Sequence, residues 1–146
     1  MRVVADASVA VKWFLPSERA DEHGEKAAAL LEAVREGRMS LLQPPHWLAE
    51  VAAVLSRLSP STARDDMTLL IAMRFQVLAS SEVYTTACKL AIAAKEHVFD
   101  TLYHAVSLLA PDALLVTADE RYYRKASKFG SILLLGDFDA GQTKNH

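Results

Sequence analysis

Four short apolar runs divide the chain and are predicted to form strands. They cover Arg2–Ala5, Met39–Leu42, Leu114–Thr117 and Ser131–Leu135. The apolar residues in these runs are adjacent rather than alternating, which is typical of strands that are buried on both faces of a sheet. The runs therefore predict a parallel sheet with helices on both sides.

Segments with apolar residues three or four positions apart separate these runs and predict helices. The clearest repeat starts at Trp47 and continues through Leu48, Val51, Val54, Leu55 and Leu58. The other predicted helices cover Ala7–Leu15, Ala20–Arg35, Thr62–Met73, Glu82–Ala94, Thr101–Leu109 and Arg121–Phe129, and Phe75–Ala79 is left unassigned. Strands that alternate with helices predict an α/β fold with three layers, α/β/α, around a central, mostly parallel sheet.

Length and composition fit one domain. The chain has 146 residues, of which 51% are hydrophobic and 23% charged, as in ordinary globular proteins. We expect a single domain over residues 1–140 and a disordered polar tail over residues 141–146. No apolar run approaches the roughly 18 residues of a membrane span, and no signal peptide is recognised. These features predict a cytoplasmic protein.

The single cysteine, Cys88, excludes an internal disulfide and a cysteine-rich zinc site. Its neighbours Ala87, Leu90 and Ala91 are apolar. We therefore expect Cys88 to be a buried and unreactive thiol.

Two acids follow predicted strands. Asp6 ends the first run, and Asp119 lies just past Leu114–Thr117. In an open parallel sheet, ligands bind outside the carboxyl ends of the strands, so both acids are expected at one edge of the sheet. Asp is also a preferred N-cap, and both residues precede predicted helices, as does Asp100 before Thr101–Leu109. Helix capping alone thus remains an alternative for each of the three.

Glu50 is a different case because it lies within a predicted helix. Taking 100° per residue, it falls roughly 80° from the centre of the apolar stripe, at the margin of the buried face. An unpaired buried carboxylate is costly. Either this carboxylate has a function, or it is a rim glutamate paired with a surface Lys or Arg.

The histidines do not form a metal motif. His23, His46, His97, His104 and His146 show no close pairing, and no His-Glu-x-x-His occurs. His104 lies one turn after Asp100 on the same helix face and is interpreted as a polar rim residue. Glycine-rich phosphate loops and nucleophile elbows are also missing from the sequence.

The net charge of −2 does not indicate nucleic-acid binding, which usually shows as a basic excess. Positive charge is concentrated after Asp119, within roughly 100° on one helix face. This basic stripe consists of Arg121, Arg124, Lys125 and Lys128. It is either a solvated helix face or a surface that binds RNA phosphates, and the sequence leaves both interpretations open.

The segments around the acids resemble the motifs of a known family. Val3–Phe14 resembles the first motif of PIN domains, and of VapC-type toxins in particular. Three further motifs follow in the family's order, at Pro45–Val51, Phe99–Ala105 and Leu115–Tyr123, and Leu135–Phe138 resembles its last strand. The resemblance spans nearly the whole chain, and four motifs in order make it specific.

The resemblance implies a catalytic pocket of four metal-binding acids, with Asp6 bridging the metals: Asp6, Glu50, Asp100 and Asp119. Ser8 and Thr117 match positions that carry hydroxyls near the site, although a helix start and a strand end also explain them. Carboxylates suit Mg²⁺ or Mn²⁺. Two such ions about 4 Å apart activate water and stabilise the leaving oxygen in phosphodiester hydrolysis, so we expect Mg²⁺ (or Mn²⁺), two ions per site.

The implied function is a metal-dependent endoribonuclease, the toxin of a type II toxin–antitoxin pair. Its implied partners are an RNA substrate, a cognate antitoxin and a second copy of the chain in a homodimer. One alternative is a PIN-fold interaction module without activity. A less favoured alternative is a receiver-like signalling domain, which would have adjacent acids after the first strand and a lysine at the end of a late strand. Residues 1–6 hold only one acid, Asp6, and Ser131–Leu135 contains no lysine.

Overall fold

The computed structural model describes residues 1–16 and 23–141, and in this part of the chain five strands form one sheet. The strands are β1 (Arg2–Ala5), β2 (Ser40–Gln43), β3 (Phe75–Val77), β4 (Ala113–Thr117) and β5 (Ile132–Leu134). Every neighbouring pair is parallel and the order is β3-β2-β1-β4-β5. The predicted parallel sheet is confirmed, and β3 fills the segment that the sequence left unassigned.

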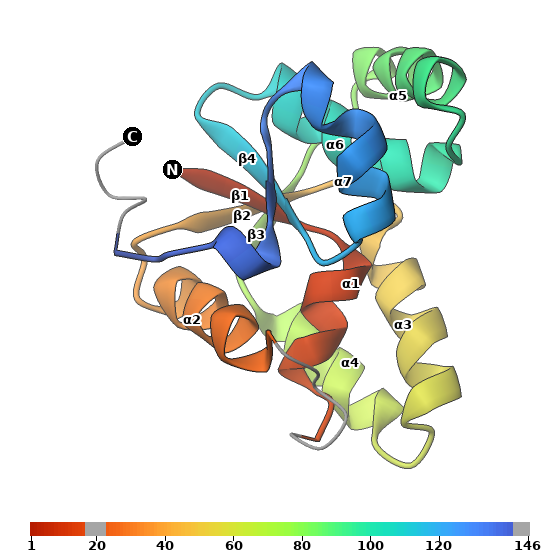
Figure 1. Ribbon diagram of the computed structural model, residues 1–146. Coiled ribbons are helices and arrows are strands. Elements are labelled where there is room, and N and C mark those ends of the chain that lie inside the picture. Colours follow the sequence, from red (N-terminus) through yellow and green to blue (C-terminus); the bar gives the residue numbers. More distant parts are fainter. Residues whose placement is uncertain (17–22, 142–146) are drawn as a thin grey trace.

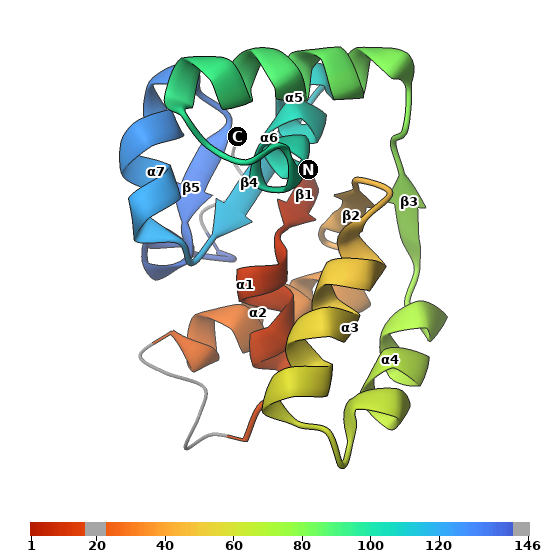
Figure 2. The same ribbon diagram turned by 90° about the vertical axis from the view of Figure 1, so that its right-hand side faces the viewer.

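Helices cover both faces of this sheet, as the three-layer prediction requires. They are α1 (Ala7–Ala10), α2 (Gly24–Arg35), α3 (Trp47–Leu58), α4 (Ala63–Ala72), α5 (Ser81–Ala94), α6 (Val98–Leu109) and α7 (Glu120–Ala126). Figure 1 and Figure 2 show α1 to α4 on one side of the sheet and α5 to α7 on the other. Helices α5 and α6 pack closely together, and α6 lies against β1 and β4.

The strand order rules out the receiver-like alternative. Receiver domains have the order 2-1-3-4-5, whereas here β1 lies between β2 and β4. The chain leaves β1 toward β2 on one side and later returns to β4 on the other. Strands β1 and β4 therefore flank the point at which the direction of winding reverses, where open α/β sheets bind their ligands.

The core consists of the apolar strands and one face of each long helix. In β1, Val3, Val4 and Ala5 are at most 1% exposed, because helices cover the central strand on both sides. Trp47 and Tyr103 are the bulkiest of the fully buried side chains and come from α3 and α6. Their burial holds the start of α3 and the middle of α6 in the core.

Several boundaries differ from the sequence prediction. The helix predicted at Arg121–Phe129 is α7 (Glu120–Ala126) followed by the 3-10 helix η2 (Ser127–Phe129). The helix predicted at Ala7–Leu15 is a single α-turn followed by the 3-10 helix η1 (Val11–Trp13). The segment Leu135–Phe138, expected to be the last strand, is mainly the 3-10 helix η3 (Leu135–Asp137) after β5. Helix α6 begins at Val98 rather than at Thr101. Residues 20–22 and 142–146, in the predicted second helix and tail, lie outside the described residues.

The prediction for Cys88 is wrong, because its side chain is exposed. Helix α5 buries a stripe that consists of Val83, Ala87, Leu90 and Ala94. Cys88 is one position beyond this stripe and is turned toward solvent by the helical step of 100°. Among the described residues, no helix is long and apolar enough to cross a membrane.

Candidate active site

The four predicted acids lie at the starts of four helices. Asp6 is the N-cap of α1 and Asp119 is the N-cap of α7. Glu50 and Asp100 lie in the first turns of α3 and α6. A helix start is the positive end of the helix dipole and favours a negative side chain. The sequence predicted that Asp100 precedes its helix, but Asp100 lies inside α6, and the N-cap is His97.

Asp6 is positioned by the register of β1 and β4. Ala5 pairs with Val116. The residues that follow these two, Asp6 and Thr117, therefore lie side by side. The hydroxyls of Ser8 and Thr117 each donate to one carboxylate oxygen of Asp6. Both predicted hydroxyl residues therefore contact Asp6, while their part in metal binding stays a prediction.

The same two hydroxyls hold the loop that carries Asp119. The Ala118 N–H donates to Ser8 Oγ at 3.0 Å, and the Asp119 N–H donates to Thr117 Oγ1 at 3.1 Å. The Asp119 carboxylate in turn accepts from the Tyr122 N–H at 3.0 Å. The starts of α1 and α7 are thus joined by one hydrogen-bond network. Capping is a real role of Asp6 and Asp119, and it is compatible with metal binding.

Glu50 lies at the partly exposed margin of α3 and is held by two side chains. The Tyr103 hydroxyl donates to Glu50 Oε1 at 2.6 Å, and His46 Nε2 lies 3.2 Å from the same oxygen. Burial works to raise the pKa of Glu50, but the hydrogen bonds from His46 and Tyr103 lower it overall. The interpretation of Glu50 as a rim residue paired with a surface Lys or Arg is therefore wrong.

Sequence reasoning missed His46 and Tyr103. Both were detectable by helical spacing, since His46 lies four residues before Glu50 and Tyr103 lies three residues after Asp100. Burial raises the pKa of Tyr103, and its bond to Glu50 raises it further. Tyr103 therefore stays protonated, and its hydroxyl donates a hydrogen bond to Glu50.

In the part of the chain that the structure describes, no charged donor is hydrogen-bonded to the Asp6 carboxylate. Burial raises its pKa to about 6, against the hydrogen bonds from Ser8 and Thr117, and the negative charge of Asp119 adds to the rise. Its hydrogen-bond donors in the described residues are two hydroxyls and the Val9 N–H, which are all neutral. The ionised form is thus poorly stabilised by the chain itself.

Asp100 connects the remaining acids electrostatically. Burial raises its pKa, and the charges of Glu50, Asp119 and Glu96 raise it further. Asp100 therefore feels Glu50 on α3 and Asp119 on α7, and Asp119 acts on Asp6. The fold has gathered the four predicted acids into one region of negative potential.

The donor chemistry of these acids fits a divalent cation. Carboxylate oxygens are the ligands that Mg²⁺ and Mn²⁺ prefer, and a cation would relieve the raised pKa values of Asp6 and Asp100. Within residues 1–16 and 23–141, however, no group of three or more His, Cys, Asp or Glu side chains is close enough to hold a metal ion. Binding one ion with three or more of these acids would draw their side chains together.

His104 is a core residue, which corrects its interpretation as a rim residue. It is fully buried, and burial lowers its pKa. The neutral ring donates from Nε2 to the Gly130 carbonyl at 2.7 Å, so Nδ1 accepts from the Tyr122 hydroxyl at 2.9 Å. His104 thereby fastens α7 to α6.

Two members of the basic stripe are engaged in ion pairs. Arg121 and Lys125 lie 3.2 Å and 2.9 Å from Oε1 of Glu96, whose side chain is only 1% exposed. Arg124 and Lys128 are exposed, and Lys128 lies over the Phe129 ring. An RNA-binding role for the stripe stays a prediction, and Arg124 and Lys128 are its members without a pairing to Glu96.

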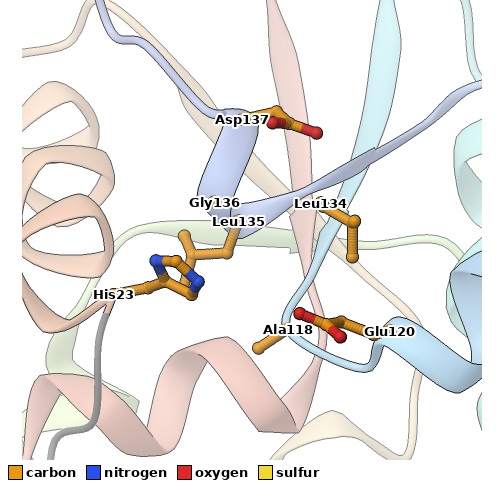
Figure 3. Close-up of a pocket in the computed structure, with 7 residues that line it drawn as sticks. All are labelled: His23, Ala118, Glu120, Leu134, Leu135, Gly136 and Asp137. Carbon is orange, nitrogen blue, oxygen red and sulfur yellow. The ribbon is translucent and has the colours of Figure 1, made fainter.

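A pocket of about 340 Å³ lies beside the loop that carries Asp119. Figure 3 shows His23 of the segment before α2 and Glu120 of α7 facing it from opposite sides. Its lining is completed by Ala118, Leu134, Leu135, Gly136 and Asp137. None of the four predicted acids lines this pocket, so it adjoins the candidate site without being part of it.

Comparison with known proteins gives one family and one fold. The family model of the PIN domain matches residues 3–128. No curated protein sequence matches the chain. Among solved structures, a chain in the crystal structure of VapBC2 from Rickettsia felis, bound to a DNA fragment from their promoter, is similar with a TM-score of 0.64 and 15% identity. The match covers 92% of this chain and 97% of that chain.

Proposed function

The chain belongs to the PIN domain family, and on that premise we propose that it is a metal-dependent endoribonuclease and the toxin of a toxin–antitoxin pair. PIN domains are generally nucleases. The observation that carries the proposal is that Asp6, Glu50, Asp100 and Asp119 lie at four helix starts and interact through their charges, beside the strands β1 and β4 at which the direction of winding reverses.

In this proposal the four acids hold Mg²⁺ or Mn²⁺. A bound ion supplies an activated water and stabilises the charge that develops on the phosphodiester. The chain's own contribution is orientation. Ser8 and Thr117 fix both oxygens of Asp6, and Tyr103 and His46 fix Glu50. Such outer contacts usually change metal affinity or activity by about 10- to 100-fold.

The proposed partners follow from the family and the structural neighbour. That neighbour is part of a VapBC2 complex, which supports an antitoxin as the partner of this chain. A homodimer and a cytoplasmic location belong to the same proposal. An antitoxin side chain such as arginine suits a pocket of carboxylates, because its guanidinium pairs with them in a bidentate manner.

One observation favours the alternative, an interaction module without activity. No group of three or more possible ligands is preassembled in the described residues. A site that has lost its function need not bind an ion at all. Metal binding and RNA cleavage must therefore be measured separately.

The test is cleavage of cellular RNA by the purified chain with Mg²⁺, with Mn²⁺ and with EDTA. We expect Asp6→Asn to lower cleavage about 10³-fold or more, because the metal supplies several kcal/mol of transition-state stabilisation. The matched control is Asp65→Asn, which changes an exposed acid that also lies in the first turn of a helix, α4. Cleavage that persists in EDTA, or in Asp6→Asn, contradicts the proposal. Metal binding without cleavage of any RNA supports the inactive module.

A further inference from the structure

Phe99 presents an aromatic ring to solvent next to Asp100, one of the four predicted acids. It is the second residue of α6, directly before Asp100, and it is 62% exposed. The other large apolar side chains exposed in the described residues are Leu58, Leu69, Ile71, Val77, Tyr84, Ile92 and Val98. None of these is the immediate neighbour of a predicted metal ligand. An exposed ring at this position needs an explanation.

The position of Phe99 is fixed by His46. The Nε2–H of His46 donates to the Phe99 carbonyl at 2.7 Å, and the two rings lie 5.8 Å apart at 45°. The same nitrogen lies 3.2 Å from Glu50 Oε1, and the His46 ring also contacts Tyr103 at 4.7 Å. Phe99 is therefore attached through one imidazole to a predicted metal ligand, although its own ring faces water.

An unpaired nucleobase fits this ring better than a protein surface does. The cores of protein interfaces are depleted in charged residues, whereas Phe99 borders Asp100 and lies one imidazole away from Glu50. Only Val98, 36% exposed, extends the apolar surface along the chain. A nucleobase requires just one flat apolar face, and its phosphate would lie toward the acids and their cations.

On this evidence we infer that Phe99 is a stacking platform for an unpaired base next to the cleaved bond of the RNA. The inference rests on the proposed nuclease function and adds that the base at the Phe99 ring must be unpaired. Bases inside an A-form helix are stacked on each other and cannot reach such a ring, whereas bases of loops and ends can. Stacking also provides affinity without positive charge, which matters in a chain with a net charge of −2.

The experiment combines one substitution with an abasic scan. Short single-stranded RNAs that carry 2-aminopurine or an abasic site at successive positions are titrated in Ca²⁺, and their cleavage is followed in Mg²⁺. We expect Phe99→Ala to raise Kd and KM about 5- to 150-fold, which corresponds to about 1–3 kcal/mol, with little change in kcat. Phe99→Trp should retain affinity. Ile92→Ala, which removes an 80% exposed side chain from α5, is the matched control and should change nothing.

The decisive readout is coupling between protein and RNA. An abasic site at the stacked position should weaken binding by wild type but not by Phe99→Ala, and 2-aminopurine there should be quenched only when the ring is present. If abasic sites weaken binding equally in wild type and in Phe99→Ala, the inference is overturned. If wild type still cleaves RNA in that case, the proposed nuclease function stands. A change in oligomeric state of Phe99→Ala, with unchanged RNA binding, also overturns it by making the ring a protein contact. If wild type neither binds nor cleaves RNA, both proposals fail.

Discussion

Asp6 is hydrogen-bonded to Thr117 at the end of β4, and Glu96 is paired with α7, the helix that follows. The surroundings of these two carboxylates differ in the charge of their partners. Glu96 lies between α5 and α6 with its charge balanced by Arg121 and Lys125. Asp6 has only neutral hydrogen-bond donors in the described residues, and its pKa is raised to about 6. A carboxylate balanced by the chain's own cations stabilises the fold, whereas a buried carboxylate with only neutral donors is costly to ionise.

The comparison also explains why the site is negative in a chain that is nearly neutral. The basic stripe follows Asp119 in the sequence, yet two of its members, Arg121 and Lys125, pair with Glu96. Glu96 itself contributes to the raised pKa of Asp100. The ion pairs therefore fasten α7 to the α5–α6 loop without neutralising the four predicted acids.

The largest effect should come from removing the cations around Glu96. Arg121→Gln with Lys125→Gln leaves a buried charge without a partner, and we expect the free energy of unfolding to fall by about 3 kcal/mol. Glu96→Gln should cost only about 1 kcal/mol, because the two released cations can reach water: their side chains are 63% and 38% exposed. Urea unfolding measures both.

The matched control is Arg124→Gln with Lys128→Gln, which removes two exposed charges from α7 and from the 3-10 helix that follows it. It should change the free energy of unfolding by less than about 0.5 kcal/mol. If Glu96→Gln proves as costly as the loss of both cations, the ion pairs are not what holds α7 in place.

How much of the fold and of the candidate site could be predicted depends on how far apart the interacting residues lie in the sequence. Asp6 and Asp119 could be placed at one edge because apolar runs locate strand ends, and parallel strands bring those ends together. The repeat beginning at Trp47 likewise predicted α3 with its observed bounds, Trp47–Leu58. Local pattern and topology were sufficient in these cases.

Long-range pairing was not predictable from the sequence. The burial of His104 could not be predicted, because its hydrogen-bond partners, Tyr122 and Gly130, lie 18 and 26 residues away in the sequence. Glu96 pairs with Arg121 and Lys125, which lie about one turn apart on α7, and the residues next to Glu96 in the sequence do not indicate this pairing. The start of α6 was missed for a different reason: its first turn, Val98–Asp100, is partly exposed and lacks a side-chain cap.

The next effect concerns pH in metal-free buffer. Asp6 has a pKa of about 6 in the folded protein and 3.8 as its ordinary value, so between these values the folded state binds the extra proton. Stability must then fall as the pH rises through this window. The stability of Asp6→Asn should not show this decrease with rising pH. At pH 7 the variant should be about 1–2 kcal/mol more stable than wild type, which raises Tm by a few degrees.

Thermal scans from pH 4 to pH 8, with EDTA and then with Mg²⁺, measure this difference. The raised pKa of Asp100 acts in the same direction in both proteins, so subtracting the two curves isolates Asp6. Mg²⁺ should remove the advantage of Asp6→Asn, because a bound cation stabilises only the folded wild type. Parallel pH curves for the two proteins would show that the Asp6 charge is already balanced.

The smallest effect tests whether the unpaired cations of the basic stripe contact RNA. Arg124 is exposed and pairs with no acid in the described residues, so its guanidinium can bind a phosphate without breaking an ion pair. Arg124→Gln should weaken RNA binding about two- to fivefold and reduce the salt slope by about 0.7, since one fewer counterion is released from single-stranded RNA. The cleavage position and kcat should not change, because phosphate contacts position the strand without reading its sequence. Arg64→Gln, on α4, is the control with one charge removed elsewhere. If Arg121→Gln changes the slope more than Arg124→Gln, then RNA draws Arg121 away from Glu96, and the separation between structural and binding charges does not hold in the complex.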